Sequence, residues 1–151
     1  MSVNQRVIYS FENSLLTSIS SEHSPTLYNI INKYGAPDEI WLSTVNVVRD
    51  SNLAVRLNLI YYDKGMAIGY VVNGSLQDDM ITGCFAKDTG KLLLVMPNSI
   101  TEYMGFWFIF EEDRHYLPLK EATGLTIDEF MELILDSEQS GCLSTSGELW
   151  D

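Results

Sequence analysis

The stretch that decides the fold is residues 53–72, which read LAVRLNLIYYDKGMAIGYVV. Large apolar side chains recur there at every second position, first in LAVRLNLIY and then in MAIGYVV. A period of two is typical of strands with one buried face, and Asp63, Lys64 and Gly65 separate the two runs. The stretch therefore predicts an antiparallel β-hairpin, with Gly65 in the left-handed position of a short bulged loop.

The two faces of this hairpin differ in polarity. The first face is fully apolar and must pack against a helix or another sheet; it carries Leu53, Val55, Leu57, Leu59, Tyr61, Met66, Ile68, Tyr70 and Val72. On the second face, Arg56 and Asn58 suggest contact with water, whereas Ile60, Tyr62 and Val71 do not. We expect any working surface to lie first on this half-apolar second face, because exposed tyrosine is favoured at interfaces.

A helix is expected before the hairpin, over residues 25–34. Ser24 is a good N-cap and Pro25 suits the first helical position. Gly35 can take a left-handed stop conformation and Pro37 prevents continuation. The apolar side chains between these signals form one stripe, which consists of Leu27, Ile30, Ile31 and Tyr34.

Two other stretches also favour helices. Thr126 and Glu129 form a capping box, which predicts a helix over 127–136. Residues 1–23 have apolar side chains at spacings of three and four, which favours an amphipathic helix. The run Val7-Ile8-Tyr9 equally suits the start of a strand, but we interpret the segment as a helix.

Further strands complete the expected fold. β-branched and aromatic residues gather in four more stretches, namely 39–48, 80–86, 92–96 and 106–110. Residues 73–75, Asn-Gly-Ser, are interpreted as a turn. The sequence thus predicts a single α+β domain over residues 1–151, with a mainly antiparallel sheet of about five or six strands and two or three helices packed on one face.

The net charge of the chain limits the kinds of partner that it is expected to bind. The 151 residues include nine basic and 21 acidic side chains, for a net charge of −12. Twelve of the acids but two of the bases lie in residues 101–151. Because an acidic surface repels phosphate groups, we expect no nucleic acid and no anionic membrane as partner. The acidic C-terminal third suits a basic protein as partner, but a solvated acidic face that keeps the protein soluble explains the same composition more simply.

Two cysteines bear on the location of the protein. Cys84 and Cys142 are too few for a disulfide framework, and we interpret them as two buried thiols. A bridge between them is expected if the protein is exported. The apolar run Val7-Ile8-Tyr9 is too short for a signal core or a membrane span, so the chain as written is expected in the cytoplasm, and outside it if an export signal was removed. Without a Cys/His cluster, no metal or cofactor is expected.

Residues 24–72 resemble a known kind of module. A short helix, the turn Tyr34-Gly35-Ala36-Pro37, a strand and a hairpin follow one another. This order resembles the helix-plus-meander modules of the BamE/SmpA outer-membrane lipoprotein family and of the related β-lactamase-inhibitor-protein fold. The resemblance implies an interaction module rather than an enzyme, and no functional residue is carried over from it.

The function expected from the sequence is a non-catalytic interaction domain that acts through an exposed sheet face or edge. The residues proposed for binding are Tyr62, Tyr70, Arg56, Trp107 and His115. An alternative is a small-molecule-binding protein, because the aromatic run at 106–110 can line a pocket, although such runs usually lie in a core strand.

An enzyme is the third possibility. His115 follows the acidic residues Glu111, Glu112 and Asp113, and general acid–base catalysis needs such groups to converge in a cleft. An exposed polar turn explains the cluster more simply. Asp78 and Asp79 likewise read as a solvated turn rather than as a cation site.

Overall fold

The predicted hairpin lies at the centre of the structure. The structure is a computed structural model that describes residues 7–12, 15–21, 26–47, 52–85, 91–95, 116–136 and 140–150. Strand β4 (Asn52–Tyr61) and strand β5 (Met66–Gln77) pair antiparallel, with Leu57 opposite Tyr70. The 3₁₀ turn η1 (Tyr62–Lys64) joins them, and Gly65 adopts left-handed φ 54° and ψ 40°. The hairpin and its glycine are therefore confirmed.

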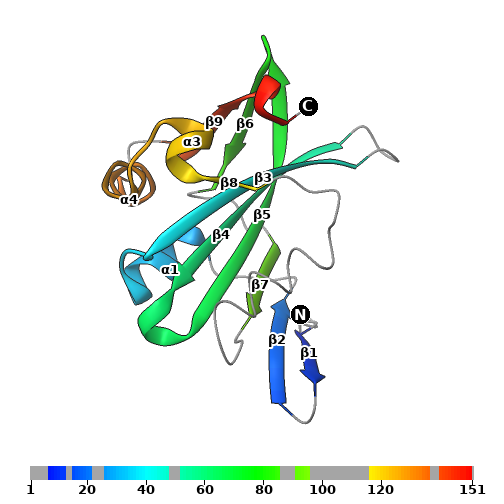
Figure 1. The fold of residues 1–151 in the computed structure, drawn as a ribbon, viewed down its shortest axis with the longest axis vertical. Helices are drawn as coiled ribbons and strands as arrows, with labels where there is room; N and C mark the ends of the chain where they lie inside the picture. The colour runs from blue at the N-terminus through cyan, green and yellow to red at the C-terminus, as the bar shows by residue number, and fades with distance from the viewer. Residues whose placement is uncertain are drawn as a thin grey trace, which may run out of the picture.

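All the described strands extend this hairpin into one antiparallel network (Figure 1). The order along the sheet is β1-β2-β7-β5-β4-β3-β8, while β6 pairs with β5 and β9. The bounds of these strands are β1 (Val7–Glu12), β2 (Leu15–Ser21), β3 (Glu39–Val47), β6 (Met80–Cys84), β7 (Lys91–Val95), β8 (Leu117–Pro118) and β9 (Cys142–Ser146). A last 3₁₀ turn, η2 (Gly147–Trp150), follows β9.

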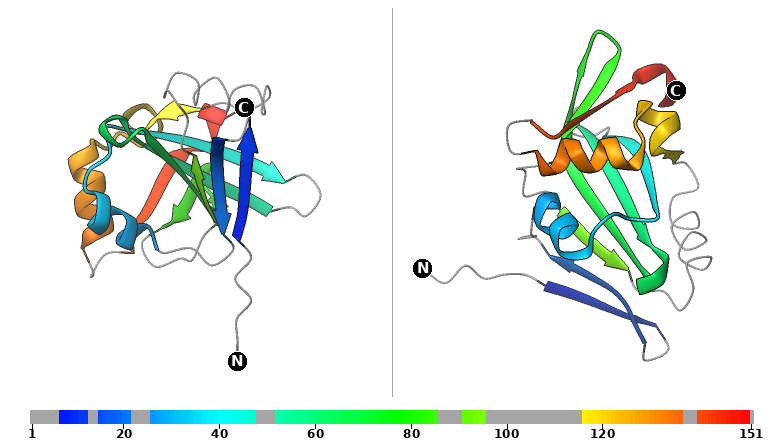
Figure 2. Two further views of the ribbon diagram at one scale, coloured as in Figure 1. Left: turned by 90° about the horizontal axis from the view of Figure 1, so that it is seen from below. Right: turned by 90° about the vertical axis from the view of Figure 1, so that its left-hand side faces the viewer.

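Helices cover one face of this sheet, as Figure 2 shows from two sides. They are α1 (Leu27–Tyr34), α3 (Leu119–Thr123) and α4 (Ile127–Leu135). Fully buried side chains from the helices and from the apolar face of the hairpin form the core, among them Leu27, Ile31, Phe130, Ile134, Leu57, Leu59, Tyr61 and Tyr70. The α+β fold class is therefore confirmed.

The helix termini follow the expected chemistry with one difference. Thr126 and Glu129 form the predicted capping box of α4. In α1, however, Thr26 is the N-cap and its side chain accepts a hydrogen bond from Asn29 N, so Ser24 was the wrong choice. Both residue types satisfy an orphan N–H equally well, and the chain uses the one closer to the apolar stripe.

Two expectations about the sheet are wrong. The N-terminal segment forms the hairpin β1–β2 rather than a helix, because its pairing with β7 decides between the strand and the helix that its residues both allow. Residues 73–75 do not turn; β5 continues through them, and the turn comes at Asp78 and Asp79, which adopt φ 50° and 61°. Gly74 is needed for a close approach instead, since a Cβ there would lie 3.0 Å from Val55 Cγ2.

The cysteines also differ from the expectation of two thiols. Cys84 at the end of β6 and Cys142 at the start of β9 lie opposite each other and form a disulfide. They are 58 residues apart, and they meet because the C-terminal tail adds strand β9 to the edge of β6. The tail has few large apolar residues, so its strand was not predicted.

None of the described helices is both long enough and apolar enough to cross a membrane.

Candidate functional site

The residues proposed for binding from the sequence do not gather at one place. Tyr62 is 47% exposed at the end of the hairpin, whereas Tyr70 is fully buried and packs near Phe85. Arg56 is half-buried and its Nη1 donates to the hydroxyl of Tyr116 at 3.2 Å. Trp107 and His115 lie outside the described residues.

The second face of the hairpin is also less open than expected. Asn58 is 5% exposed and Ile60 is fully buried, so neither reaches water. Alternating polarity predicted which side chains share this face, but it did not predict that the middle of the face is covered. The accessible parts of this face lie at its two ends, around Tyr62 and around Asn73.

A groove opens at the edge of the sheet, where β8 leaves β3. Pro118 and Leu117 pair with Trp41 and Leu42, and a strand continued from Pro118 would lie next to Ile40. Instead the chain turns away into α3 at residue 119. Proline has no N–H for the ladder, which is one reason why the strand ends there. The place of the missing strand is left as a groove.

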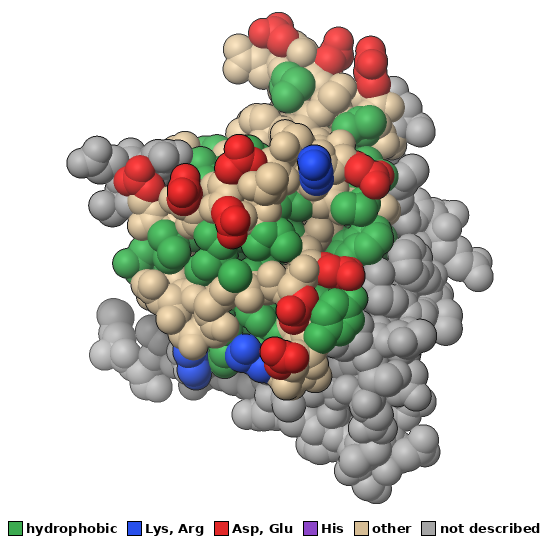
Figure 3. Space-filling model, turned by 60° about the vertical axis from the view of Figure 1, so that its left-hand side comes forward, with side chains coloured by type: hydrophobic (Ala, Val, Ile, Leu, Met, Phe, Trp, Pro, Cys, Tyr) green, Lys and Arg blue, Asp and Glu red, His purple; other side chains and the backbone are tan. Residues whose placement is uncertain are grey.

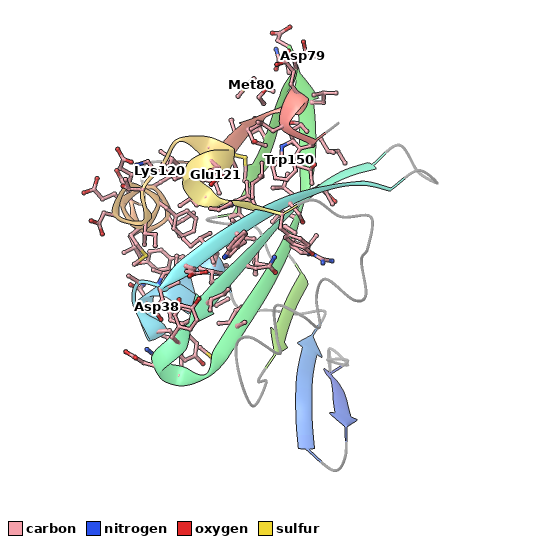
Figure 4. All side chains as sticks on the ribbon, viewed as in Figure 1. Asp38, Asp79, Met80, Lys120, Glu121 and Trp150 are labelled. Atoms are coloured by element: carbon pink, nitrogen blue, oxygen red, sulfur yellow. A yellow bond between two sulfur atoms is a disulfide. The ribbon has the colours of Figure 1, made fainter. Side chains whose placement is uncertain are left out.

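This edge groove has a volume of about 440 Å³. It is lined by Asp38, Glu39, Ile40, Trp41, Pro118, Leu119, Lys120, Leu125, Thr126 and Ile127. Six of these ten residues are apolar, and the two acids lie at the β3 end. Figure 4 labels Asp38 near α1 and Lys120 near α3, and both residues line the groove.

The acidic end of the groove is held in place by hydrogen bonds. Trp41 Nε1 donates to Glu39 Oε2 at 2.9 Å, and the Tyr62 hydroxyl is hydrogen-bonded to the same carboxylate. The backbone N–H of Tyr62 donates to Asp38 Oδ2 at 2.6 Å. The bond to Glu39, together with desolvation and the negative charges of Glu39 and Asp38, raises the pKa of Tyr62 to about 12. Tyr62 of the turn η1 therefore contacts both carboxylates, and Trp41 of β3 holds that of Glu39 as well.

The opposite wall is built by the start of α4. Thr126 N and Oγ1 donate to Glu129 Oε2 at 2.8 and 2.9 Å, and Glu129 N donates back to Thr126 Oγ1. These bonds, chiefly the one from the backbone, lower the pKa of the Glu129 carboxyl, to which Lys120 also contributes. The capping box therefore satisfies the N–H groups of Thr126 and Glu129 at this helix terminus.

Beneath the acidic end, Tyr61 ties the sheet to the end of α1. Its hydroxyl donates to the Gly35 carbonyl at 3.0 Å, and its ring lies 6.1 Å from that of Tyr34. Burial, followed by the effects of Tyr34 and Asp38, raises the pKa of Tyr61 to about 12. The folded state therefore favours the neutral phenol.

This raised pKa predicts a loss of stability at alkaline pH. A group whose pKa is raised on folding contributes its full stability below the unfolded value of 10, and the contribution disappears as pH rises toward 12. Two pH units at roughly 1.4 kcal/mol each bound the effect at about 3 kcal/mol. Urea unfolding followed by circular dichroism between pH 8 and 12 measures it. The pKa of Tyr62 is raised to the same value, but this side chain is 47% exposed and solvent screening reduces its contribution to stability. We therefore expect Tyr61→Phe to reduce the slope above pH 10 more than Tyr62→Phe; equal slopes in the two variants contradict the assignment.

The edge groove presents apolar surface beside charged side chains. Within the described ranges, no group of three or more His, Cys, Asp and Glu side chains is placed to hold a metal ion. The groove combines an apolar floor, a half-buried Trp41, two fixed carboxylates and one lysine. Figure 3 shows hydrophobic side chains gathered on this side of the molecule, with acidic side chains around them.

Sequence reasoning missed this groove. Its residues come from two segments, 38–41 and 118–127, which are brought together by the two-residue pairing of β3 with β8 and by the packing of α3 against β3. The available signal was Pro118 between two leucines, which indicates a strand end followed at once by a helix.

Comparison with known proteins found no matching family model, no matching curated protein and no matching solved structure.

Proposed function

We propose that this chain is a non-catalytic interaction domain that binds an extended segment of a partner protein in the edge groove. The observation that carries the proposal is the strand position next to Ile40 and Glu39, which β8 leaves when α3 begins. An extended peptide in that position adds main-chain hydrogen bonds to a sheet edge, while pockets for its alternate side chains give specificity.

The floor of the groove suits such a segment. Leu119, Leu125 and Ile127 lie on the helical side, and Ile40 and Trp41 on the strand side. Burial of apolar surface drives association, and main-chain pairing fixes the direction of the bound segment. Side chains that point toward the helices would lie in the apolar part of the groove.

Charge supports a basic partner. The segment 116–136, which supplies one wall, has five acids and one base. Asp38 and Glu39 add two negative charges on the other wall. Opposite charge accelerates association and selects against acidic competitors.

The disulfide supports a location outside the cytoplasm. Cross-links between cysteines persist in oxidising compartments and are rare in the cytosol. The Cys84–Cys142 bridge thus favours the second of the two expected locations. The resemblance of residues 24–72 to BamE/SmpA modules, which implies an interaction module, supports the same proposal.

A small amphipathic molecule is the second candidate ligand. The volume of the edge groove, about 440 Å³, falls within the range of about 300–1,000 Å³ that is usual for such sites. The aromatic run at 106–110, on which this alternative was first based, lies outside the described residues.

The proposal is tested by selecting peptides that bind the protein and by substituting groove residues with tryptophan. Peptides are selected on the wild-type protein from a displayed library of random sequences, and their affinities are measured by fluorescence polarisation. Leu125→Trp and, independently, Ile127→Trp place a bulky ring in the groove and are expected to weaken binding at least about tenfold. The matched control Leu149→Trp alters an exposed leucine that does not line the groove, and it should bind as the wild type does. A library that yields no binder, or binders that tolerate both groove variants, contradicts the proposal.

A further inference from the structure

The carboxylate of Glu39 is the most distinctive polar group of the edge groove. An ionised carboxylate has about four acceptor sites. The hydrogen bonds that the structure gives it come from the Trp41 indole and the Tyr62 phenol, both of which are neutral. These bonds fix the position of the carboxylate without cancelling its charge.

Two aromatic side chains accompany this charge. Trp41 lies two residues further along β3, on the same side of the strand as Glu39. Tyr62 comes two residues after Ile60, the residue that pairs with Glu39. Trp41 is half-buried and lines the groove, while Tyr62 is exposed and hydrogen-bonded to Glu39. A negative group beside accessible aromatic rings attracts a cation that carries an apolar stem.

We propose that Glu39 and Trp41 form a subsite for one arginine side chain of the bound partner segment. This inference rests on the proposed function, since it names a residue of the segment that the groove receives. The guanidinium meets the Glu39 carboxylate, and its planar group and methylene stem lie along the Trp41 ring. The neighbouring Asp38 carboxylate, held by the backbone N–H of Tyr62, adds a second negative charge.

Arginine fits this subsite better than lysine does. Its guanidinium is planar, stacks on aromatic faces and donates in a fork that matches a carboxylate. The ammonium of lysine is a compact and strongly hydrated charge, and it gains less from an indole ring. Lysine in place of arginine is therefore expected to bind more weakly.

The experiment uses the peptides selected on the wild-type protein. Each is synthesised with arginine, lysine or citrulline at the enriched position, because citrulline keeps the shape of arginine and lacks its charge. Glu39→Gln retains an acceptor for Trp41 and removes the negative charge. The matched control is Glu132→Gln, which makes the same change at an exposed position of α4 outside the groove.

The expected result is a charge-specific loss. Glu39→Gln weakens the arginine peptide about tenfold or more, leaves the citrulline peptide within about twofold, and flattens the salt dependence of binding. Glu132→Gln changes neither affinity by more than about twofold. Retained citrulline binding also shows that the variant is folded.

The experiment distinguishes failure of the proposed function from failure of the arginine subsite. If no peptide is selected, the proposed function itself fails. If peptides bind in the groove but are not enriched in arginine, or if Glu39→Gln weakens the arginine and citrulline forms equally, the arginine subsite is overturned and the interaction groove stands.

Discussion

Replacing both cysteines, as Cys84→Ser with Cys142→Ser, is expected to lower the free energy of unfolding by about 4 kcal/mol. The two residues are 58 positions apart in the sequence, and a cross-link over a loop of that length removes much of the entropy of the unfolded chain. Serine is close to cysteine in size and both sites are at least partly accessible, so little packing is lost beyond the cross-link.

The local effect should be greatest at the C-terminal end. Strand β9 pairs with β6, and Gly147 N donates to the Asp79 carbonyl just beyond this pairing. Trp150 Nε1 donates to Thr145 Oγ1 at 3.1 Å. Without the cross-link, these contacts alone must hold the C-terminal tail against the sheet. Backbone amide hydrogen exchange should therefore accelerate first in residues 142–150.

Urea denaturation at neutral pH measures the loss in stability, and mass spectrometry of the wild type without reductant establishes the bridge. The control is the wild type under reductant, whose midpoint should approach that of the double variant. A loss under about 1 kcal/mol, or free thiols in the non-reduced wild type, contradicts the prediction.

The sequence predicted the centre of the fold because its signals there agree with one another. The alternation in 53–72 specifies strands, and the capping box at Thr126 and Glu129 specifies where α4 begins. Each of these signals is local and can be read within about ten residues. Elements with such signals were found at nearly the observed positions.

The parts that were missed depend on distant contacts. Strand β9 is short and polar, and it exists because β6 offers an edge and Cys84 offers a partner for Cys142. The N-terminal hairpin pairs with β7, which lies about 70 residues further along the chain. In both cases the environment decided between structures that local propensity left open.

The candidate site was missed for the same physical reason. Tyr62 was singled out and does stand at its margin, but Asp38, Glu39 and Trp41 seemed ordinary for the start of a strand. Their significance comes from sharing the lining of the groove with Leu119 and the start of α4, and no periodicity in the sequence brings those residues together. The groove forms between β3 and the segment 118–127, whereas periodicity in the sequence describes one helix or strand at a time.

The second large effect is expected for Phe130→Ala, which should lower the free energy of unfolding by about 3–5 kcal/mol. Phe130 is fully buried and is one of the largest side chains of the core that α4 shares with α1 and the sheet. Truncation removes its apolar contacts and leaves a cavity that a close-packed core fills only partly.

This substitution also tests whether the affinity of the groove for peptides depends on the packing of α4. The start of α4 supplies Thr126 and Ile127 to the groove wall, and Phe130 anchors the helix one turn further on. Urea denaturation measures the stability, and fluorescence polarisation measures the affinity for library-selected peptides under conditions where the variant is folded. Leu149→Ala, at an exposed position away from α4, is the control and should cost less than about 1 kcal/mol. If Phe130→Ala lowers both the stability and the affinity for peptide, the bound segment contacts α4. If the stability falls by the expected amount and the affinity of the folded variant is unchanged, the bound segment gains its binding energy from the β3 side alone.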